Sequence, residues 1–281
     1  MKTTPLSPAV RTLFVFCAFL AAFSLPAEEP RQPRFPELEG YPADWLPEPP
    51  EGFHWKLDWH DEFDGTEIDT TKWEAVETVR RNAFWSKDAF SLDGSGNLKM
   101  TTFLREDGTY IDGCLRTRGK YEKAKGFFVA RMRLQRQVGH WSAFWLMGDC
   151  EGSIGGGSAD GAEIDIMEKP TLDDKVNFAI HWDGYGKEHE SVGQFTSIDE
   201  SIMEGFHTFA LWWADDAYRF YVDGRLFWET TAGGICTQPL YVKLSDEIQF
   251  DFWAGDIRTA ELPDESLVDY VRVYDLVPDE E

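Results

Sequence analysis

The feature that most constrains the fold is a series of short stretches in which apolar and polar residues alternate between turn-forming residues. Residues 218–228 carry alternating aromatic side chains around Asp223-Gly224, a strong β-hairpin signal. Residues 90–100 show a similar pattern around a glycine-rich turn, and helical periodicity of any length is hard to find. Many short strands without intervening helices predict two antiparallel sheets packed face to face.

The length of 281 residues favours one large domain, because all-β sandwiches commonly use roughly 200–250 residues in a single unit. Aromatic residues make up 15% of the chain, which is high for an ordinary soluble domain. These rings need either a thick core or a ligand with flat surfaces.

The first 27 residues have the pattern of a signal peptide. Two positive charges, Lys2 and Arg11, precede an apolar run over 13–25, and small residues offer cleavage after Ser24 or Ala27. The run is short for a bilayer span, which disfavours a membrane anchor. We therefore expect a secreted or periplasmic protein with no membrane attachment in its mature form.

Residues 28–52 are crowded with proline and cannot form the interior of a sheet or helix. We expect a linker or a strap on the domain surface, followed by the main folded domain over 53–281. The prolines are Pro30, Pro33, Pro36, Pro42, Pro47, Pro49 and Pro50.

The net charge of the chain narrows its possible partners. The value of −24 disfavours nucleic acid, which is bound mainly by clustered Lys and Arg, and fits a neutral or lightly charged partner.

The cysteines allow more than one state. If Cys17 leaves with the signal peptide, Cys114, Cys150 and Cys236 remain, which permits one disulfide and one free thiol, or none. None of them has a recognisable basic or histidine partner, so we interpret them as structural.

An acidic segment, Glu163-Ile-Asp-Ile-Met-Glu168, is the strongest functional signal. In a strand, Glu163 and Asp165 share one face and the two isoleucines take the other. Strict alternation would bury Glu168 with the apolar residues, at a cost of several kcal/mol. A one-residue β-bulge around Ile166 and Met167 would return Glu168 to the acidic face.

Three carboxylates on one strand face repel one another, so their pKa values are pushed apart. A proton donor and a nucleophile on one strand are what glycosidic hydrolysis needs. The alternative is a solvated acidic face in an acidic protein, which the surrounding Ile, Met and Trp residues disfavour.

The segment 163–168 resembles the catalytic signature of glycoside hydrolase family sixteen in its bulge-containing form, the group of laminarinases, lichenases, agarases, carrageenases and endo-β-galactosidases. The similarity covers roughly residues 53 to 276. Further matches are Trp141-Ser-Ala-Phe-Trp145, with Ser142 where proline is more usual, His181-Trp182, Asp61-Glu-Phe-Asp64 and Asp269-Tyr-Val-Arg-Val273.

The resemblance implies a jelly roll of two curved sheets with an open cleft on the concave face. It implies that Glu163 is the nucleophile, that Glu168 is the general acid and then base, and that Asp165 holds and tunes Glu163. No metal or organic cofactor is required, although Asp269 resembles a position that helps to bind a structural calcium in some relatives. We expect a monomer.

Sugar rings pack on aromatic faces, which makes Trp85, Trp141, Trp145 and Trp182 candidate binding residues, with core packing as the alternative for each. Arg81 and Asn82 could bind hydroxyl groups. His181 resembles a family histidine near the carboxylates, although a lone histidine is more often structural. The loop that follows it lacks the tight ligand spacing of a metal site.

The sequence thus predicts a retaining endo-β-glycosidase, and the first expectation for its substrate is a β-1,3- or mixed-linkage β-1,3/1,4-glucan. The alternative substrate is an N-acetyllactosamine-containing host glycan, cut by an endo-β-galactosidase. A carbohydrate-binding module without catalysis is the rival from another class, and the intact acidic triad disfavours it.

Overall fold

The computed structural model describes residues 44–148 and 153–280. The expected signal peptide (1–27), the first part of the proline-rich segment (28–43) and Cys150 lie outside these ranges.

The described part of the chain contains nineteen β-strands and four short 3₁₀ helices, and no α-helix. None of these helices could cross a membrane. The strands are β1 (Phe53–Asp61), β2 (Glu74–Ala75), β3 (Thr78–Arg80), β4 (Ala83–Trp85), β5 (Phe90–Leu92), β6 (Leu98–Leu104), β7 (Tyr110–Asp112), β8 (Cys114–Arg116), β9 (Glu122–Lys123), β10 (Gly126–Arg133), β11 (His140–Met147), β12 (Glu163–Lys169), β13 (Lys175–Trp182), β14 (Glu190–Ser197), β15 (His207–Trp213), β16 (Tyr218–Val222), β17 (Arg225–Thr230), β18 (Leu240–Ile248) and β19 (Asp264–Pro278). The 3₁₀ helices are η1 (Lys87–Ala89), η2 (Gly157–Asp160), η3 (Glu200–Met203) and η4 (Ile257–Thr259).

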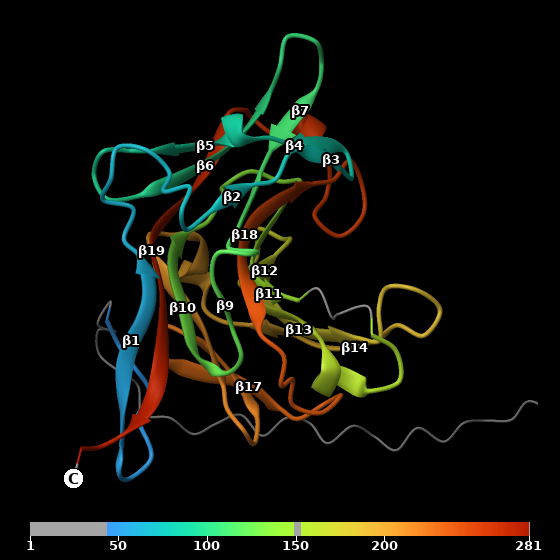
Figure 1. Cartoon of the computed structure of the whole chain (residues 1–281). Coiled ribbons are helices and arrows are strands. Elements are labelled where there is room, and N and C mark those ends of the chain that lie inside the picture. The colour runs from blue at the N-terminus through green and yellow to red at the C-terminus, as the bar shows by residue number, and fades with distance from the viewer. Residues whose placement is uncertain (1–43, 149–152, 281) are drawn as a thin grey trace, which may run out of the picture. The chain divides into compact units, whose positions relative to one another are not determined.

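The strands form two sheets, as the sequence predicts (Figure 1). The larger sheet has the order β17-β16-β15-β10-β19-β6-β7-β4-β3, with β1 added beside β19 and β5 beside β6. The smaller sheet has the order β14-β13-β12-β11-β18-β8-β2, with β9 beside β18. The pairing between described strands is antiparallel except between β4 and β7.

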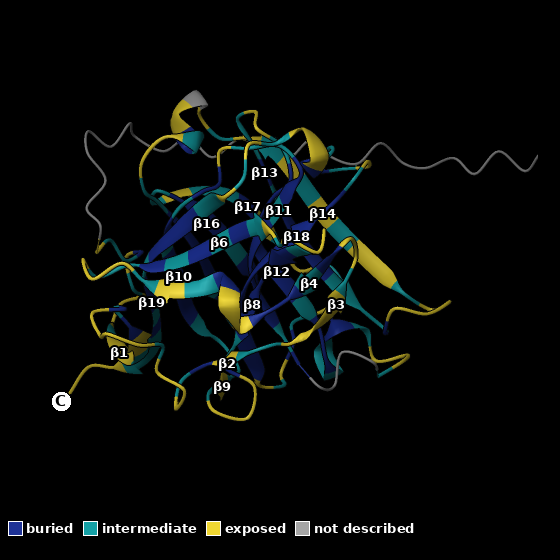
Figure 2. Cartoon of the chain, turned by 90° about the horizontal axis from the view of Figure 1, so that it is seen from above, coloured by how far each residue is buried: buried dark blue, intermediate teal, exposed yellow. Residues whose placement is uncertain are grey.

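The core lies between the two sheets, and the central strands that face it are mostly buried, whereas β1 and β14 are largely exposed (Figure 2). Phe128 and Phe209 enter it from the larger sheet, and Phe144 and Phe178 enter it from the smaller one, each with 0% exposure. Each such ring contributes about 2–3 kcal/mol by leaving water.

The hairpin predicted at Asp223-Gly224 joins β16 to β17. Both turn residues have positive φ, 45° and 73°, and Val222 pairs with Arg225. This is the geometry of a two-residue type I′ turn, whose twist matches that of the flanking strands. The hairpin prediction is confirmed.

The last residues of the proline-rich segment lie on the outer face of the larger sheet. The Trp45 ring lies 5.4 Å from that of Tyr221, and the Trp55 indole donates to the Pro47 carbonyl at 2.7 Å. Tyr221 belongs to a second apolar cluster on the sheet face opposite the main core. Residues 44–50 therefore cover apolar side chains that would otherwise face water.

The end of the larger sheet formed by β7, β4 and β3 approaches the smaller sheet. The Trp85 indole of β4 donates to the Asp246 carbonyl of β18 at 2.8 Å. This contact places side chains from β3 and β4 beside the exposed face of the smaller sheet.

Candidate active site

The bulge predicted in the acidic strand is present in β12. Between Asp165 and Glu168 the strand advances by three residues, whereas its partners advance by two, from Trp145 to Ala143 on β11 and from Ala179 to Asn177 on β13. The extra residue resets the alternation, so that Glu168 returns to the face that carries Glu163 and Asp165.

The apolar residues of the same strand take the opposite face. Ile164, Ile166 and Met167 are fully buried in the core. The three acids instead line one cavity on the exposed face of the smaller sheet. The local sequence therefore separates a packing face from a chemical face along one strand.

Glu168 is the more deeply buried of the two glutamates, with 7% exposure. Its Oε1 accepts a hydrogen bond from the Trp141 indole at 2.7 Å, and its Oε2 accepts one from the Asn177 amide at 2.6 Å. Burial and then the charge of Asp165 raise its pKa well above the usual value, and these two donors only partly oppose the rise. Glu168 therefore has the environment of a proton donor.

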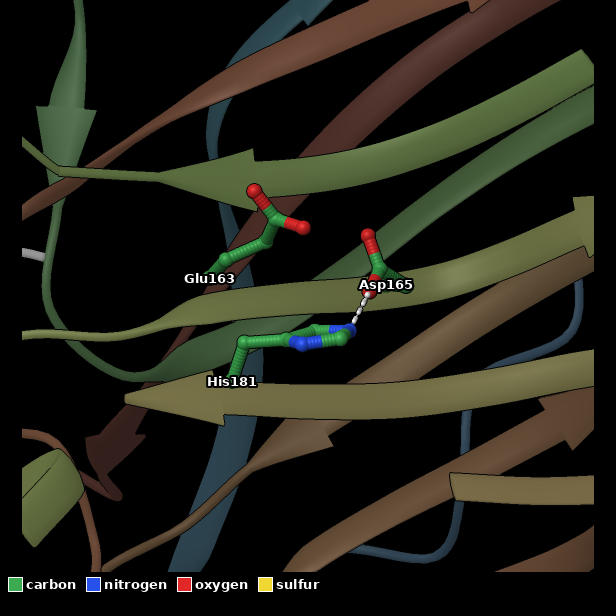
Figure 3. Close-up of side chains that lie close together, drawn as sticks. All are labelled: Glu163, Asp165 and His181. Carbon is green, nitrogen blue, oxygen red and sulfur yellow. Dashed lines mark ion pairs between the residues drawn. The ribbon is translucent and has the colours of Figure 1, made fainter. Parts of the chain in front are cut away.

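Asp165 lies between the two glutamates along the strand and is 3% exposed. Burial and then the charge of Glu163 raise its pKa well above the usual value. Figure 3 shows Glu163, Asp165 and His181 converging from β12 and β13, with His181 Nε2 at 3.3 Å from Asp165 Oδ2. When Asp165 keeps its proton, it does not repel a negative charge on the neighbouring Glu163.

Among the described residues, these three side chains are also close enough together to be considered as a possible metal-binding group. One donor atom from each lies within 4.8 Å of the others. A carboxylate must be ionised to bind a metal ion, so an Asp165 that keeps its proton disfavours metal binding by this group. The loop after β13 adds His189, whose Nε2 lies 3.0 Å from His181 Nδ1 and whose ring stacks on that of His181 at 5.2 Å.

Glu163 is partly exposed at the end of β12. It accepts a hydrogen bond at Oε2 from the hydroxyl of Tyr185, a residue of the loop between β13 and β14. Tyr185 and His189 also line the cavity, although neither was predicted as a site residue from the sequence.

Strand β18 forms the other side of the floor. Lys243, Ser245 and Glu247 alternate along it and all face the cavity. The sequence alternation places them on one face of a strand but does not show which strands lie beside it. Lys243 Nζ lies 3.4 Å from the centroid of Trp145, and the Trp145 indole donates to Ser245 Oγ at 3.0 Å. Burial lowers the pKa of Lys243.

Two arginines from the end of β3 complete this side. Arg80 and Arg81 both form ion pairs with Glu247, which is 5% exposed. The guanidinium of Arg81 also lies 4.5 Å from the centroid of Trp141. Of the residues predicted to bind sugar, Arg81, Trp85, Trp141 and Trp145 line the cavity.

Two residues selected as sugar-binding candidates lie elsewhere. Asn82 is exposed in the turn between β3 and β4 and does not line the cavity. Trp182 packs against the main core, and its ring lies so close to Gly233 that a Cβ there would meet it at 2.8 Å. The strand alternation explains this placement, because Trp182 follows His181 and points to the other face.

The remaining motif residues have structural contacts. Asp61 accepts hydrogen bonds from the Phe63 amide at 3.0 Å and the Trp73 indole at 2.8 Å. Asp269, the calcium candidate, forms an ion pair with Arg131 at 2.5 Å. The carboxylate is thus paired with a guanidinium, and calcium binding at Asp269 stays a prediction.

Cys114 is a free thiol, and both Cys114 and Cys236 are buried. Burial raises the pKa of the Cys114 thiol to about 11. A thiol of this kind is unreactive. These two cysteines fit the structural role predicted for them.

Residues 55–276 match the family model described as "Beta-porphyranase A-D, GH16 domain". Glucan endo-1,3-beta-glucosidase A1 of Niallia circulans is 27% identical over 257 residues, covering 78% of this chain and 37% of that protein. Keratan-sulfate endo-1,4-beta-galactosidase of Sphingobacterium multivorum is 28% identical over 241 residues, covering 79% of this chain and 56% of that protein. The chain thus spans about a third to just over half of these relatives.

Solved structures show the same architecture. The endo-beta-1,3-glucanase from Pyrococcus furiosus superposes with a TM-score of 0.68 at 26% sequence identity, covering 82% of this chain and 97% of that chain. The likeness confirms the predicted jelly roll of two packed sheets.

Proposed function

The chain belongs to glycoside hydrolase family 16, and we propose that it is a retaining endo-β-glycosidase whose chemistry is carried by Glu163 and Glu168. The observation that carries the proposal is the bulge in β12, which places both carboxyl groups in one cavity but in different environments. Glu168 is buried, with a raised pKa, whereas Glu163 lies at the partly exposed end of the strand.

In the first step, Glu168 donates its proton to the leaving glycosidic oxygen while Glu163 attacks the anomeric carbon. The bond to the leaving sugar breaks, and an ester between Glu163 and the remaining glycan forms. In the second step, Glu168, now ionised, removes a proton from water, which displaces Glu163 and restores both groups. Two inversions leave the product with the β configuration of the substrate.

The neighbours of these groups support the roles. Because its pKa is raised, Asp165 can keep its proton and donate a hydrogen bond toward Glu163, which would stabilise the negative charge on the nucleophile. His181 Nε2 lies 3.3 Å from Asp165 Oδ2 on the neighbouring strand, close to the face that carries both acids. Trp141 is partly exposed and can offer an apolar face to a sugar ring, whereas Trp85 and Trp145 are only 4% and 6% exposed and support the wall of the same cavity.

For the substrate, a β-1,3- or mixed-linkage glucan remains the first candidate, and the endo-1,3-beta-glucosidase and endo-beta-1,3-glucanase relatives support it. A galactose-containing glycan is the second candidate. The match to a β-porphyranase family model and the likeness to a keratan-sulfate endo-1,4-beta-galactosidase favour it. Product analysis on laminarin, mixed-linkage glucan, agarose, porphyran, keratan sulfate and mucin O-glycans separates the two candidates.

The endo mode is tested on the best of these substrates, where the early products should be oligosaccharides of mixed length. Release of only monosaccharide from chain ends would contradict it. We also propose that the protein is exported and acts as a monomer. N-terminal sequencing of protein recovered outside the cytoplasm and light scattering test these two points.

The decisive experiment for the mechanism is proton NMR of the nascent reducing end. A retaining enzyme releases the β anomer first, and the α anomer grows only by mutarotation. An α product at the earliest time would overturn the assignment of Glu163 and Glu168.

A further inference from the structure

The loop over 183–189 brings two side chains to the nucleophile end of the cavity. It turns sharply after β13, because Asp183 and Gly184 both have positive φ, 59° and 74°. The Asp183 carboxylate accepts a hydrogen bond at 3.0 Å from the Gly155 amide, which ties this loop to the glycine-rich loop before β12. This hydrogen bond restricts the position of the loop and therefore of Tyr185, which follows Gly184.

Tyr185 is 57% exposed, yet its hydroxyl is directed into the cavity. The hydroxyl donates to Glu163 Oε2 and lies 3.9 Å from Met147 Sδ. The ring centroid lies 5.7 Å from that of His189, which in turn stacks on His181. The contact of the Tyr185 ring with His189 does not by itself explain why the Tyr185 hydroxyl donates to the Glu163 carboxylate.

We propose that Tyr185 is a positioning residue for the nucleophile. Its hydroxyl holds Oε2 of Glu163, which leaves Oε1 to attack the anomeric carbon. A glutamate side chain at a partly exposed strand end has considerable rotamer freedom, and a fixed donor removes part of it before substrate binds. The inference rests on the proposed function, because it assigns a role relative to Glu163 as nucleophile.

The other ionisable groups near Glu163 come from different elements. Asp165 lies on the same strand, His181 faces it from β13, and Lys243 acts on it from β18. Tyr185 differs from these groups because it donates a hydrogen bond without carrying a charge. Removal of its hydroxyl therefore tests the hydrogen bond while all the charged groups are kept.

The test is the pH dependence of kcat/KM for Tyr185→Phe, measured on the best substrate of the panel. The ratio kcat/KM reports the free enzyme, in which this hydrogen bond is present. The ionised form of Glu163 loses a donor, so the acid limb should move to higher pH by about one unit, a tenfold loss of activity on that limb. The basic limb, set by Glu168, should stay in place.

A matched control is Tyr121→Phe, because the Tyr121 hydroxyl also donates to a carboxylate, Asp58 Oδ2 at 2.7 Å, and neither residue lines the cavity. This variant should leave both limbs unchanged. Tyr185→Ala should shift the acid limb as Tyr185→Phe does, which separates the hydroxyl from the ring. An acid limb that does not move in either Tyr185 variant would overturn the proposal.

Failure of the underlying function would look different. If the wild-type protein cleaves no glycan, or if Glu163→Gln keeps full activity, the nucleophile is wrongly assigned and the role of Tyr185 falls with it. If wild-type hydrolysis is lost in Glu163→Gln but Tyr185→Phe has the wild-type profile, only the positioning role is overturned.

Discussion

The indole nitrogen of Trp141 lies 2.7 Å from Oε1 of Glu168, so one side chain both lines the cleft and donates to the proposed acid. The Asn177 amide occupies the other oxygen. Both donors favour the ionised form of Glu168, whereas burial favours the protonated form and dominates. The balance suits a group that must first give and later take a proton.

Asn177→Ala tests this balance. Loss of the amide removes one donor to the carboxylate, so the already raised pKa of Glu168 should rise further. The basic limb of the kcat/KM profile should then move to higher pH, by about one unit for one charge-assisted hydrogen bond. Trp141→Phe should move it in the same direction. A shift of the limb to lower pH would contradict the assignment of Glu168 as the acid.

Variants of the two glutamates should differ in kind. Glu163→Gln removes the nucleophile and should lower kcat by several orders of magnitude on any substrate. Glu168→Ala should spare the first step for a substrate with an activated leaving group, because such a group departs without a proton.

Azide distinguishes the two variants further. In Glu168→Ala, azide should intercept the glycosyl-enzyme and give a β-glycosyl azide, since a small anion needs no general base. A β-glycosyl azide from the Glu163→Gln variant, together with an α-glycosyl azide from Glu168→Ala, would instead exchange the two roles.

The sequence was sufficient for the parts of this protein that follow from local alternation. The bulge in β12 was predicted because the acidic residues 163, 165 and 168 cannot share a face without it. The placement of Trp141 and Trp145 on one face of β11 follows from the same rule. Lys243 and Glu247 obey this rule too, but only the strand order shows that β18 lies beside β11.

Other features depend on long-range contacts that no local pattern encodes. Tyr185 reaches Glu163 because a tethered loop folds back over the sheet, and Arg81 reaches the cavity because the far end of the larger sheet approaches β18. Trp182 was chosen for its neighbour His181, although adjacent residues of a strand point to opposite faces.

Glu247→Gln should weaken substrate binding more than it slows the chemistry. The buried Glu247 carboxylate is the shared partner of Arg80 and Arg81, which lie at the edge of the cavity beside Trp141. Without that charge, both guanidinium groups lose their anchor and the turn that carries them becomes less ordered. We expect KM to rise about tenfold, with kcat changed less, on the preferred glycan. A loss confined to kcat would argue that Glu247 acts on the reacting groups instead.

The last prediction concerns stability and rests on Asp112 of β7. This residue is 1% exposed, and neither carboxyl oxygen has a hydrogen-bond partner. Burial and then the charges of Asp246 and Glu247 raise the pKa of Asp112 well above its usual value. The folded protein therefore keeps this proton at a pH where the unfolded chain releases it.

The sign of the effect follows from proton linkage. Below the usual aspartate pKa, both states hold the proton and Asp112 causes no pH dependence. Above it, unfolding releases the proton, so this residue makes the folding equilibrium up to tenfold less favourable for each pH unit, until the folded state also ionises. Asp112→Asn removes this dependence while keeping the shape of the side chain. Urea denaturation should show a variant whose free energy of unfolding exceeds that of the wild type by an amount that grows between about pH 5 and about pH 8. A variant less stable than the wild type across this range would show that the carboxyl group is ionised and paired in the folded state.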